Sequence, residues 1–312
     1  PISIALDGDN DVFVANISSN SVSELTESSN YATGLNYGNS TGAAFSIPNS
    51  IALDPTGDLF VTNLLTSTVS ELTQASGYSS GSHFAPSGAA LNSPVGIVLD
   101  SSANLYVLNF DSVSELFSAD MGMGPYGTGA NYTGSPGAML DDPDSIALDG
   151  QNNIFVANVS NSSVSELTAA STYATGMNFN NTTNPGAGFA NPSFVVVDGD
   201  DNIFVANNDN SSVSELTAPS SGTPIGYNFA PAAAANSAPT QLAIDESGNI
   251  FLVGDSNSVS ELIGLATPVY TPVEAESAGG AGRAGVAIIV FLTLLTFWYG
   301  RKYRHALTKR TA

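Results

Sequence analysis

Residues 146–167 read IALDGQNNIFVANVSNSSVSEL, and variants of this segment recur along most of the chain. Five further copies begin at Ile4, Ile51, Ile97, Val195 and Leu242. An aspartate follows the first apolar run of every copy, and these markers are Asp7, Asp54, Asp100, Asp149, Asp198 and Asp245. Successive markers are 46 to 49 residues apart. A near-constant period of this length indicates a chain built from repeated structural units.

Each repeat contains three short runs that are typical of β-strands. In the first copy they are Ile4–Leu6, Val12–Val14 and Val22–Leu25, separated by polar turns. β-Branched and aromatic residues favour strands, and short polar gaps suit hairpin turns. The linkers carry a fourth strand with the pattern glycine, any residue, asparagine and aromatic. It starts at Gly34, Gly81, Gly129, Gly176 and Gly226, with His83 replacing the asparagine in the second copy.

These runs predict an all-β fold, a six-bladed β-propeller of four-stranded blades. Its repeat cores cover about residues 1–26, 47–73, 93–117, 142–168, 191–217 and 238–263. Only five linkers carry the fourth-strand pattern, so the sixth blade lacks a strand at its own end. Either Val269–Thr271 supplies it, or it precedes Pro1 and the propeller is truncated at its N-terminus. Further blades upstream also remain open.

The repeat resembles the NHL repeat, in which a proline precedes an apolar strand, an Asp-x-x-Gly-Asn turn, an aromatic strand and Asn-x-Val. Pro48–Val69, Pro143–Val164 and Pro192–Val213 follow this order. The sequence of the repeat also resembles that of exported bacterial NHL-type proteins. Where the family often has Asp, at the end of the second strand, this chain has Asn16, Asn63, Asn109, Asn158 and Asn207, and the last copy has Gly254-Asp255. The resemblance covers residues 1–263 and implies the fold more than a function, because propellers host many activities.

Charge is distributed very unevenly over the 312 residues. Residues 1–282 contain all 28 acidic residues and no Lys or Arg. A body without cations cannot neutralise phosphates, which excludes nucleic acid as a partner. Cysteine is absent, which excludes disulfides, thiolate zinc sites and cysteine nucleophiles. His83 is the single histidine before residue 283, too few for a histidine-ligated zinc site.

The C-terminal end differs from the repeats. Residues 264–283 form a linker rich in Pro, Ala and Gly, residues 284–300 are an uncharged apolar run, and residues 301–312 are basic. The apolar run predicts a membrane helix that is short for a hydrocarbon core of about 30 Å, and the flanking Arg283 and Arg301 can snorkel. Basic residues stay on the cytoplasmic side, so we expect a cytoplasmic tail and an extracellular or periplasmic propeller. A cleaved sorting signal is the alternative.

The acidic residues are the candidates for a functional site. Gluconolactonase-like propellers hold a divalent ion at the channel with carboxylates and asparagines. By this resemblance the marker aspartates would form a ring that binds Ca²⁺ or Mg²⁺, since hard cations prefer oxygen ligands. The simpler interpretation is that each accepts backbone N–H groups in its own turn. The glutamates of the third strands, Glu24, Glu71, Glu115, Glu166, Glu215 and Glu261, are expected to form a solvated stripe. The carboxylates that are not repeated are Asp111, Asp120, Asp141, Asp142 and Asp209, and they form no convincing cluster.

Two functions remain open. The first is a cell-surface or exported scaffold that binds an extracellular protein, peptide or glycan and is anchored in the lipid bilayer by residues 284–300. The second is a divalent-metal-dependent lactonase or hydrolase. The side-chain inventory favours the scaffold over an enzyme and predicts no catalytic or cofactor-binding residue, while a metal site stays undecided. We expect specificity to lie in the least regular linkers, Met121–Leu140 and Pro231–Pro239, because binding residues concentrate on variable loops.

Overall fold

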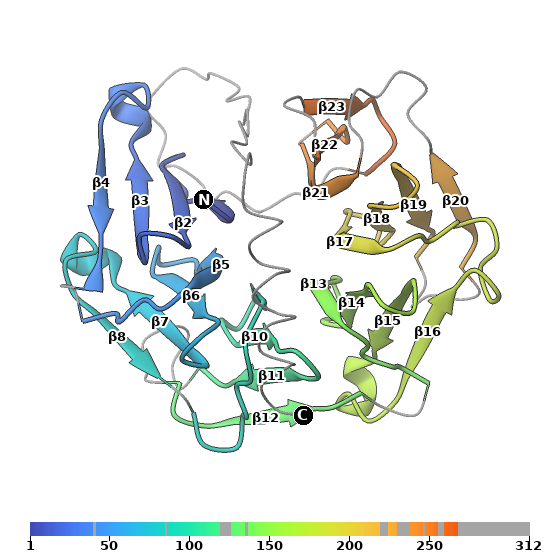
Figure 1. The fold of residues 1–312 in the computed structure, drawn as a ribbon, viewed down its shortest axis with the longest axis horizontal. Coiled ribbons are helices and arrows are strands. Elements are labelled where there is room, and N and C mark those ends of the chain that lie inside the picture. The colour runs from blue at the N-terminus through green and yellow to red at the C-terminus, as the bar shows by residue number, and fades with distance from the viewer. Residues whose placement is uncertain are drawn as a thin grey trace, which may run out of the picture. The chain divides into compact units, whose positions relative to one another are not determined.

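The computed structural model describes residues 1–39, 42–84, 86–118, 126–134, 137–218, 224–229, 238–245, 247–254 and 259–267. These residues form 23 β-strands and short 3₁₀ turns, with no α-helix among them. The strands make six antiparallel sheets that follow one another along the chain, and we call these sheets blades 1 to 6 (Figure 1). The chain divides into two compact units, one within Pro1–Asn131 and the other starting at Tyr132.

The first unit holds three four-stranded blades, in which each strand pairs with its neighbours in chain order. Blade 1 consists of β1 (Ser3–Leu6), β2 (Val12–Asn16), β3 (Ser21–Leu25) and β4 (Gly34–Tyr37). Blade 2 consists of β5 (Pro48–Leu53), β6 (Leu59–Asn63), β7 (Thr68–Leu72) and β8 (Gly81–Phe84). Blade 3 consists of β9 (Gly96–Leu99), β10 (Leu105–Leu108), β11 (Val113–Leu116) and β12 (Gly129–Tyr132). The 3₁₀ turns η1 (Glu27–Ser29) and η3 (Gln74–Ser76) follow β3 and β7.

The second unit repeats this plan. Blade 4 consists of β13 (Pro143–Leu148), β14 (Ile154–Asn158), β15 (Ser163–Leu167) and β16 (Gly176–Asn180), with η4 (Ala169–Ser171) after β15. Blade 5 consists of β17 (Pro192–Val197), β18 (Ile203–Asn207), β19 (Ser212–Leu216) and β20 (Gly226–Phe229). Blade 6 consists of β21 (Pro239–Ile244), β22 (Ile250–Gly254) and β23 (Val259–Leu262).

Each blade is a meander whose register follows from its sequence. In blade 4, Ile146 of β13 lies opposite Val156 of β14, and Ala157 of β14 lies opposite Val164 of β15. Side chains alternate between the two faces of a strand, so the apolar residues of neighbouring strands meet on the same face. The first strand of this blade begins at Pro143, where the register shifts. Proline has no N–H to donate and is therefore tolerated at the first residue of a strand.

Buried aromatic side chains hold adjacent blades together. Tyr78, which follows η3 in blade 2, packs against Phe13 of blade 1 with ring centroids 5.0 Å apart in an edge-to-face arrangement. Tyr126 of blade 3 packs in the same way against Phe60 of blade 2, at 5.3 Å. All four rings are buried. Edge-to-face pairs add about 0.5–1.5 kcal/mol to the gain from burying their area. These contacts make neighbouring blades depend on one another for stability.

The glycine that opens the fourth strand is required by close packing. A Cβ atom at Gly81 would lie 2.3 Å from the carbonyl oxygen of Glu71 and 3.2 Å from the Cβ of Ala43. The equivalent Gly129 would place its Cβ 2.2 Å from the carbonyl oxygen of Glu115. No side chain fits these spaces, which explains why the pattern repeats with glycine in each linker.

The prediction of an all-β propeller with six blades is confirmed. Five blades have four strands, and the sixth has three strands among the described residues. The predicted fourth strand at Val269–Thr271 and the predicted membrane helix at 284–300 lie outside the described residues. Within the ranges given above, no helix is long and apolar enough to cross a membrane.

Candidate functional site

The six marker aspartates shape the turn between the first two strands of each blade. Asp100 shows the arrangement, in which Oδ1 accepts the backbone N–H of Ser102 at 2.9 Å and that of Asn104 at 2.8 Å. The same two bonds, to the second and fourth residues after the aspartate, recur in all six blades. These bonds show that each marker aspartate holds its own turn, as the simpler interpretation of the sequence predicted.

The last residue of this turn connects it to the end of the third strand. In blade 3 the Oδ1 atom of Asn104 accepts the backbone N–H of Ser118 at 3.0 Å. The equivalent oxygens in the other blades accept the N–H groups of Glu27, Gln74, Ala169, Ala218 and Gly264. Over the described ranges, no group of three or more His, Cys, Asp or Glu side chains is placed to hold a metal ion.

The glutamates of the third strands were predicted to form a solvated stripe, and the structure shows that this prediction was wrong for several of them. Glu24, Glu115 and Glu166 are buried, although Glu261 is exposed. Glu24 accepts the hydroxyl hydrogen of Tyr37 from β4, and Glu115 accepts that of Tyr106 from β10 at 2.8 Å. Charged groups are rarely buried without partners, and here tyrosines on adjacent strands supply them. The glutamates of blades 1 and 3 therefore serve the interior of the blade.

The asparagines that end the second strands are structural as well. Asn63 is fully buried; its Nδ2 donates to Ser70 Oγ at 2.8 Å, and its Oδ1 accepts the N–H of Ser46 at 2.9 Å. Asn109, Asn158 and Asn207 make the same two kinds of bond. Both ends of these amides are occupied within the blade, so they do not present donors or acceptors to a ligand.

The remaining predicted candidates are placed apart from one another. His83 is exposed on β8, opposite Ser70, as expected for a polar residue of an outer strand. Asp111 is exposed in the turn between β10 and β11. Asp209 lies in the turn after β18 and accepts a hydrogen bond from Asn191 Nδ2 at 3.0 Å. Asp141 and Asp142 precede β13 and are half-buried, and Asp120 and Asp255 lie outside the described residues.

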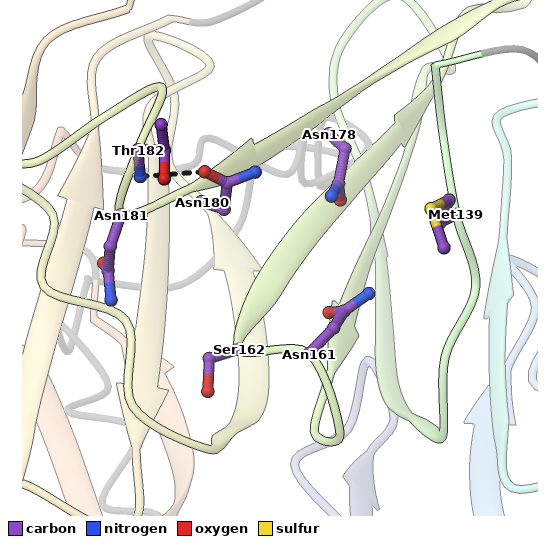
Figure 2. A pocket seen from close by; sticks show the side chains of 7 residues that line it. All are labelled: Met139, Asn161, Ser162, Asn178, Asn180, Asn181 and Thr182. Carbon is purple, nitrogen blue, oxygen red and sulfur yellow. Dashed lines mark hydrogen bonds between the residues drawn. The ribbon is translucent and has the colours of Figure 1, made fainter.

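A pocket of about 360 Å³ lies on blade 4, within the second unit (Figure 2). Three segments line it: the connection before β13, the turn between β14 and β15, and the end of β16 with the residues after it. The lining residues are Met139, Asn161, Ser162, Asn178, Asn180, Asn181 and Thr182, and we call this site the amide pocket. It contains no titratable side chain. Its wall combines neutral amides and hydroxyls with the exposed thioether chain of Met139.

Three amide nitrogens of the amide pocket have no hydrogen-bond partner among the described residues. Their oxygens are engaged: Asn161 accepts from Ser163 Oγ at 2.5 Å, and Asn178 accepts from Ser165 Oγ at 3.1 Å. Asn180 Oδ1 accepts the N–H of Thr182 at 2.8 Å. These bonds fix the side chains and leave each Nδ2 free to donate. Figure 2 shows the amide ends of Asn161 and Asn178 turned toward each other.

Asn181 has a different role at the edge of the amide pocket. Its Nδ2 donates to the carbonyl oxygen of Phe189 at 2.8 Å, and its Oδ1 accepts the N–H of the same residue at 2.7 Å. This paired contact ties the end of the pocket loop to the connection that leads into blade 5. The pocket therefore has one edge held by paired hydrogen bonds and three oriented donors, an arrangement suited to binding the oxygens of a polar, uncharged ligand.

One of the two linkers expected to carry specificity contributes a residue to this pocket, and the specificity itself stays a prediction. The irregular linker Met121–Leu140 was expected to carry specificity, and its Met139 does line the amide pocket. The other expected linker, Pro231–Pro239, lies largely outside the described residues. The pocket asparagines were not predicted, although the run NFNNTTN at residues 178–184 is a departure from the other linkers that could have drawn attention to them.

Comparison with known proteins shows the fold but no family. No protein-family model and no curated protein matches the chain. Among solved structures, inactive virginiamycin B lyase from Staphylococcus aureus with quinupristin is similar, at 11% identity and a TM-score of 0.65 over 85% of this chain and 84% of the lyase. A streptogramin B lyase is similar at 15% identity and a TM-score of 0.66, over 84% of this chain and 82% of that one. The NHL resemblance stays a prediction.

A gluconolactonase from Xanthomonas campestris is also similar, at 14% identity and a TM-score of 0.54 over 84% of this chain and 85% of the enzyme. These neighbours are six-bladed β-propeller proteins. At identities this low the likeness concerns the fold alone, because one fold supports many unrelated functions.

Proposed function

We propose that this chain is a surface scaffold that binds a neutral glycan in the amide pocket of blade 4. The observation that carries the proposal is the set of oriented, unpaired Nδ2 donors of Asn161, Asn178 and Asn180 in a pocket without any charged group. Sugar hydroxyls accept hydrogen bonds from such amides, and the exposed side chain of Met139 offers an apolar surface to a sugar ring.

The charge distribution of the chain favours an uncharged ligand over an anion or a cation. Residues 1–282 contain only acidic charged side chains, so the field around the propeller repels anions such as phosphates, sulfated sugars and uronic acids. A cationic ligand would need a carboxylate to pair with, and the amide pocket has none. A neutral saccharide needs only hydrogen-bond donors and acceptors. Asparagine and threonine side chains supply both.

The location of the scaffold is part of the proposal and rests on the sequence. Residues 284–300 would anchor the chain in a lipid bilayer, and the basic residues 301–312 would stay in the cytoplasm. The propeller would then be extracellular or periplasmic, where glycans are abundant. The resemblance of the repeat pattern to exported NHL-type proteins is consistent with this location.

The alternative is a divalent-metal-dependent lactonase or hydrolase. The likeness to gluconolactonases and streptogramin lyases makes this alternative worth testing, although it concerns the fold only. Turnover of gluconolactone by the full chain, dependent on added Ca²⁺ or Mg²⁺ and abolished by a chelator, would decide for the enzyme and against the scaffold.

A glycan array probed with the full chain tests the scaffold, followed by titration calorimetry of the best neutral oligosaccharide. Asn161→Ala should weaken binding about tenfold, the loss expected for one hydrogen bond of about 1.4 kcal/mol. Asn210→Ala is a matched control from blade 5, because Asn210 accepts from Ser212 Oγ at 2.6 Å just as Asn161 accepts from Ser163 Oγ at 2.5 Å. The control should bind normally. An array without neutral-glycan binding, or equal effects of the two variants, would refute the assignment.

A further inference from the structure

The turn that follows the first strand differs between blades at its last position. Blades 3 to 6 have asparagine there, at Asn104, Asn153, Asn202 and Asn249, whereas blades 1 and 2 have Asp11 and Asp58. Each of these asparagines donates its Nδ2 to the Oδ2 atom of the marker aspartate, at 2.8 to 3.0 Å. In those four blades both carboxylate oxygens of the marker aspartate therefore have hydrogen-bond donors.

Blade 2 lacks this donor. Asp54 is only 6% exposed, and its Oδ1 accepts from the backbone N–H of Thr56, the hydroxyl of Thr56 and the N–H of Asp58. Its Oδ2 is buried and has no hydrogen-bond partner among the described residues. A buried carboxylate oxygen without a donor costs free energy that the other blades avoid. The Oδ2 atom of Asp54 therefore needs a hydrogen-bond donor, which asparagine supplies in blades 3 to 6.

The side chain of Asp58 occupies the place of that asparagine. Its Oδ1 accepts the N–H of Gln74 at 2.7 Å, just as Asn104 Oδ1 accepts the N–H of Ser118 at 3.0 Å. In the asparagine blades, where the oxygen at this place is held in the same way, the other end of the side chain reaches the Oδ2 atom of the marker aspartate. Two carboxylate oxygens can bond only when one carries a hydrogen. Blade 1 repeats the geometry, since Asp11 accepts the N–H of Glu27 at 2.7 Å and donates its own N–H to Asp7 at 2.8 Å.

We propose that Asp54 and Asp58 share one proton in an O–H···O hydrogen bond that replaces the amide N–H···O bond of blades 3 to 6. Asp7 and Asp11 form a second, more exposed pair of the same kind in blade 1. The proton comes from solvent, and its loss leaves two facing carboxylates. The turns of blades 1 and 2 are thus built to become more stable as the pH falls, whereas the turns of blades 3 to 6 have an amide in place of the second carboxyl group.

The surroundings favour the protonated pair. The titratable groups that interact with the blade 2 pair are Glu71, Tyr78 and Tyr126, and those near the blade 1 pair are Asp9, Tyr37 and Tyr78. None can be a cation, and no Lys or Arg occurs before residue 283 to neutralise a second negative charge. Burial raises the pKa of Asp58, and the carboxylate of Asp54 raises that pKa further. Burial and the carboxylate of Asp11 likewise raise the pKa of Asp7.

The sign of the pH effect follows from these directions. An acid whose pKa is higher in the folded chain than in the unfolded chain binds its proton more tightly when folded. Its contribution to stability is fully present in acid and is lost as the pH rises through the folded pKa. Substitution of Asp58 by asparagine should therefore matter at neutral and alkaline pH, where the proton has left, and much less in acid.

The test measures thermal unfolding of the full chain by circular dichroism between about pH 4.5 and pH 8. Asp58→Asn should raise the Tm by about 2–4 °C at pH 8 and change it little at pH 4.5. The reciprocal variant Asn104→Asp should lower the Tm at pH 8 and recover in acid, because it builds a carboxyl pair into blade 3. Asp111→Asn removes an exposed carboxylate in the turn between β10 and β11, outside both pairs, and serves as the matched control for a general charge effect.

Several outcomes would overturn the proposal. Equal shifts for Asp58→Asn at both pH values would show that the pair holds no proton. A pH dependence that Asp111→Asn reproduces would also count against a shared proton. A bound cation is the competing explanation: if millimolar Ca²⁺ at pH 8 raises the Tm of the parent chain but not of Asp58→Asn, a metal ion rather than a proton bridges the carboxylates. If Asn104→Asp fails to fold, the comparison of Asp58→Asn with Asp111→Asn still decides.

Discussion

At the scale of the residue, adding a single methyl group at Gly81 shows how closely the outer strand β8 packs against β7. Gly81→Ala would bring a Cβ atom to 2.3 Å from the carbonyl oxygen of Glu71 and 2.9 Å from Leu72 Cδ2. The backbone of β8 must move away from β7 to relieve this overlap. Overpacking of this kind costs about 1–3 kcal/mol, which chemical denaturation monitored by circular dichroism will measure as a lower free energy of unfolding.

Gly8→Ala is the matched control for that measurement. A Cβ atom at Gly8 meets nothing within 4 Å, so its substitution should change the free energy of unfolding by less than about 0.5 kcal/mol. Equal stability of the Gly81 and Gly8 variants would mean that β8 does not pack as closely as described. The glycine pattern would then need another cause.

At the scale of the element, the tyrosine after η3 joins blade 2 to blade 1. The ring of Tyr78 contacts Phe13 and Tyr37, and its hydroxyl donates to the carbonyl oxygen of Gly57 at 3.0 Å. Tyr78→Phe removes only the hydrogen bond and should lower the free energy of unfolding by about 1 kcal/mol. Tyr78→Ala also removes the ring and should cost about 3–5 kcal/mol. Urea unfolding of both variants gives these values. Similar losses of unfolding free energy in the two variants would contradict the role of the ring.

The strands could be predicted from the sequence because each is encoded within a few neighbouring residues and then repeated six times. The environment of Glu24 was missed, because a charged residue in a short strand is expected to be solvated, although the two-residue alternation places Glu24 on the same face as Val22. Its partner Tyr37 comes from the adjacent strand β4. The amide pocket is harder still, since Met139, Asn161 and Asn178 belong to three segments that each read as ordinary polar loop or strand. Local pattern determines elements, whereas sites arise where elements meet.

At the scale of the whole molecule, the many carboxylates repel one another. The formal net charge is −22, and the 28 acidic residues all lie before the six basic ones. Self-repulsion of this size destabilises a compact state. Burial also raises the pKa of Glu71 and Glu215, so the folded chain takes up protons before the unfolded chain does. Both effects make the folded state more stable as the pH falls from neutral toward about 5.

Salt should therefore stabilise this protein, and more so at high pH. Mobile ions screen exposed charges beyond about 10 Å at 0.1 M ionic strength, which weakens the repulsion among carboxylates. We expect sodium chloride, raised from 0.02 to 0.5 M, to increase the Tm of the full chain by several degrees at pH 8. At about pH 4.5 the increase should be smaller, because many carboxylates then carry protons. Differential scanning calorimetry at the two pH values measures both shifts. Since ion effects on apolar burial act at either pH, equal increases would assign the stabilisation to them and contradict the account based on charge.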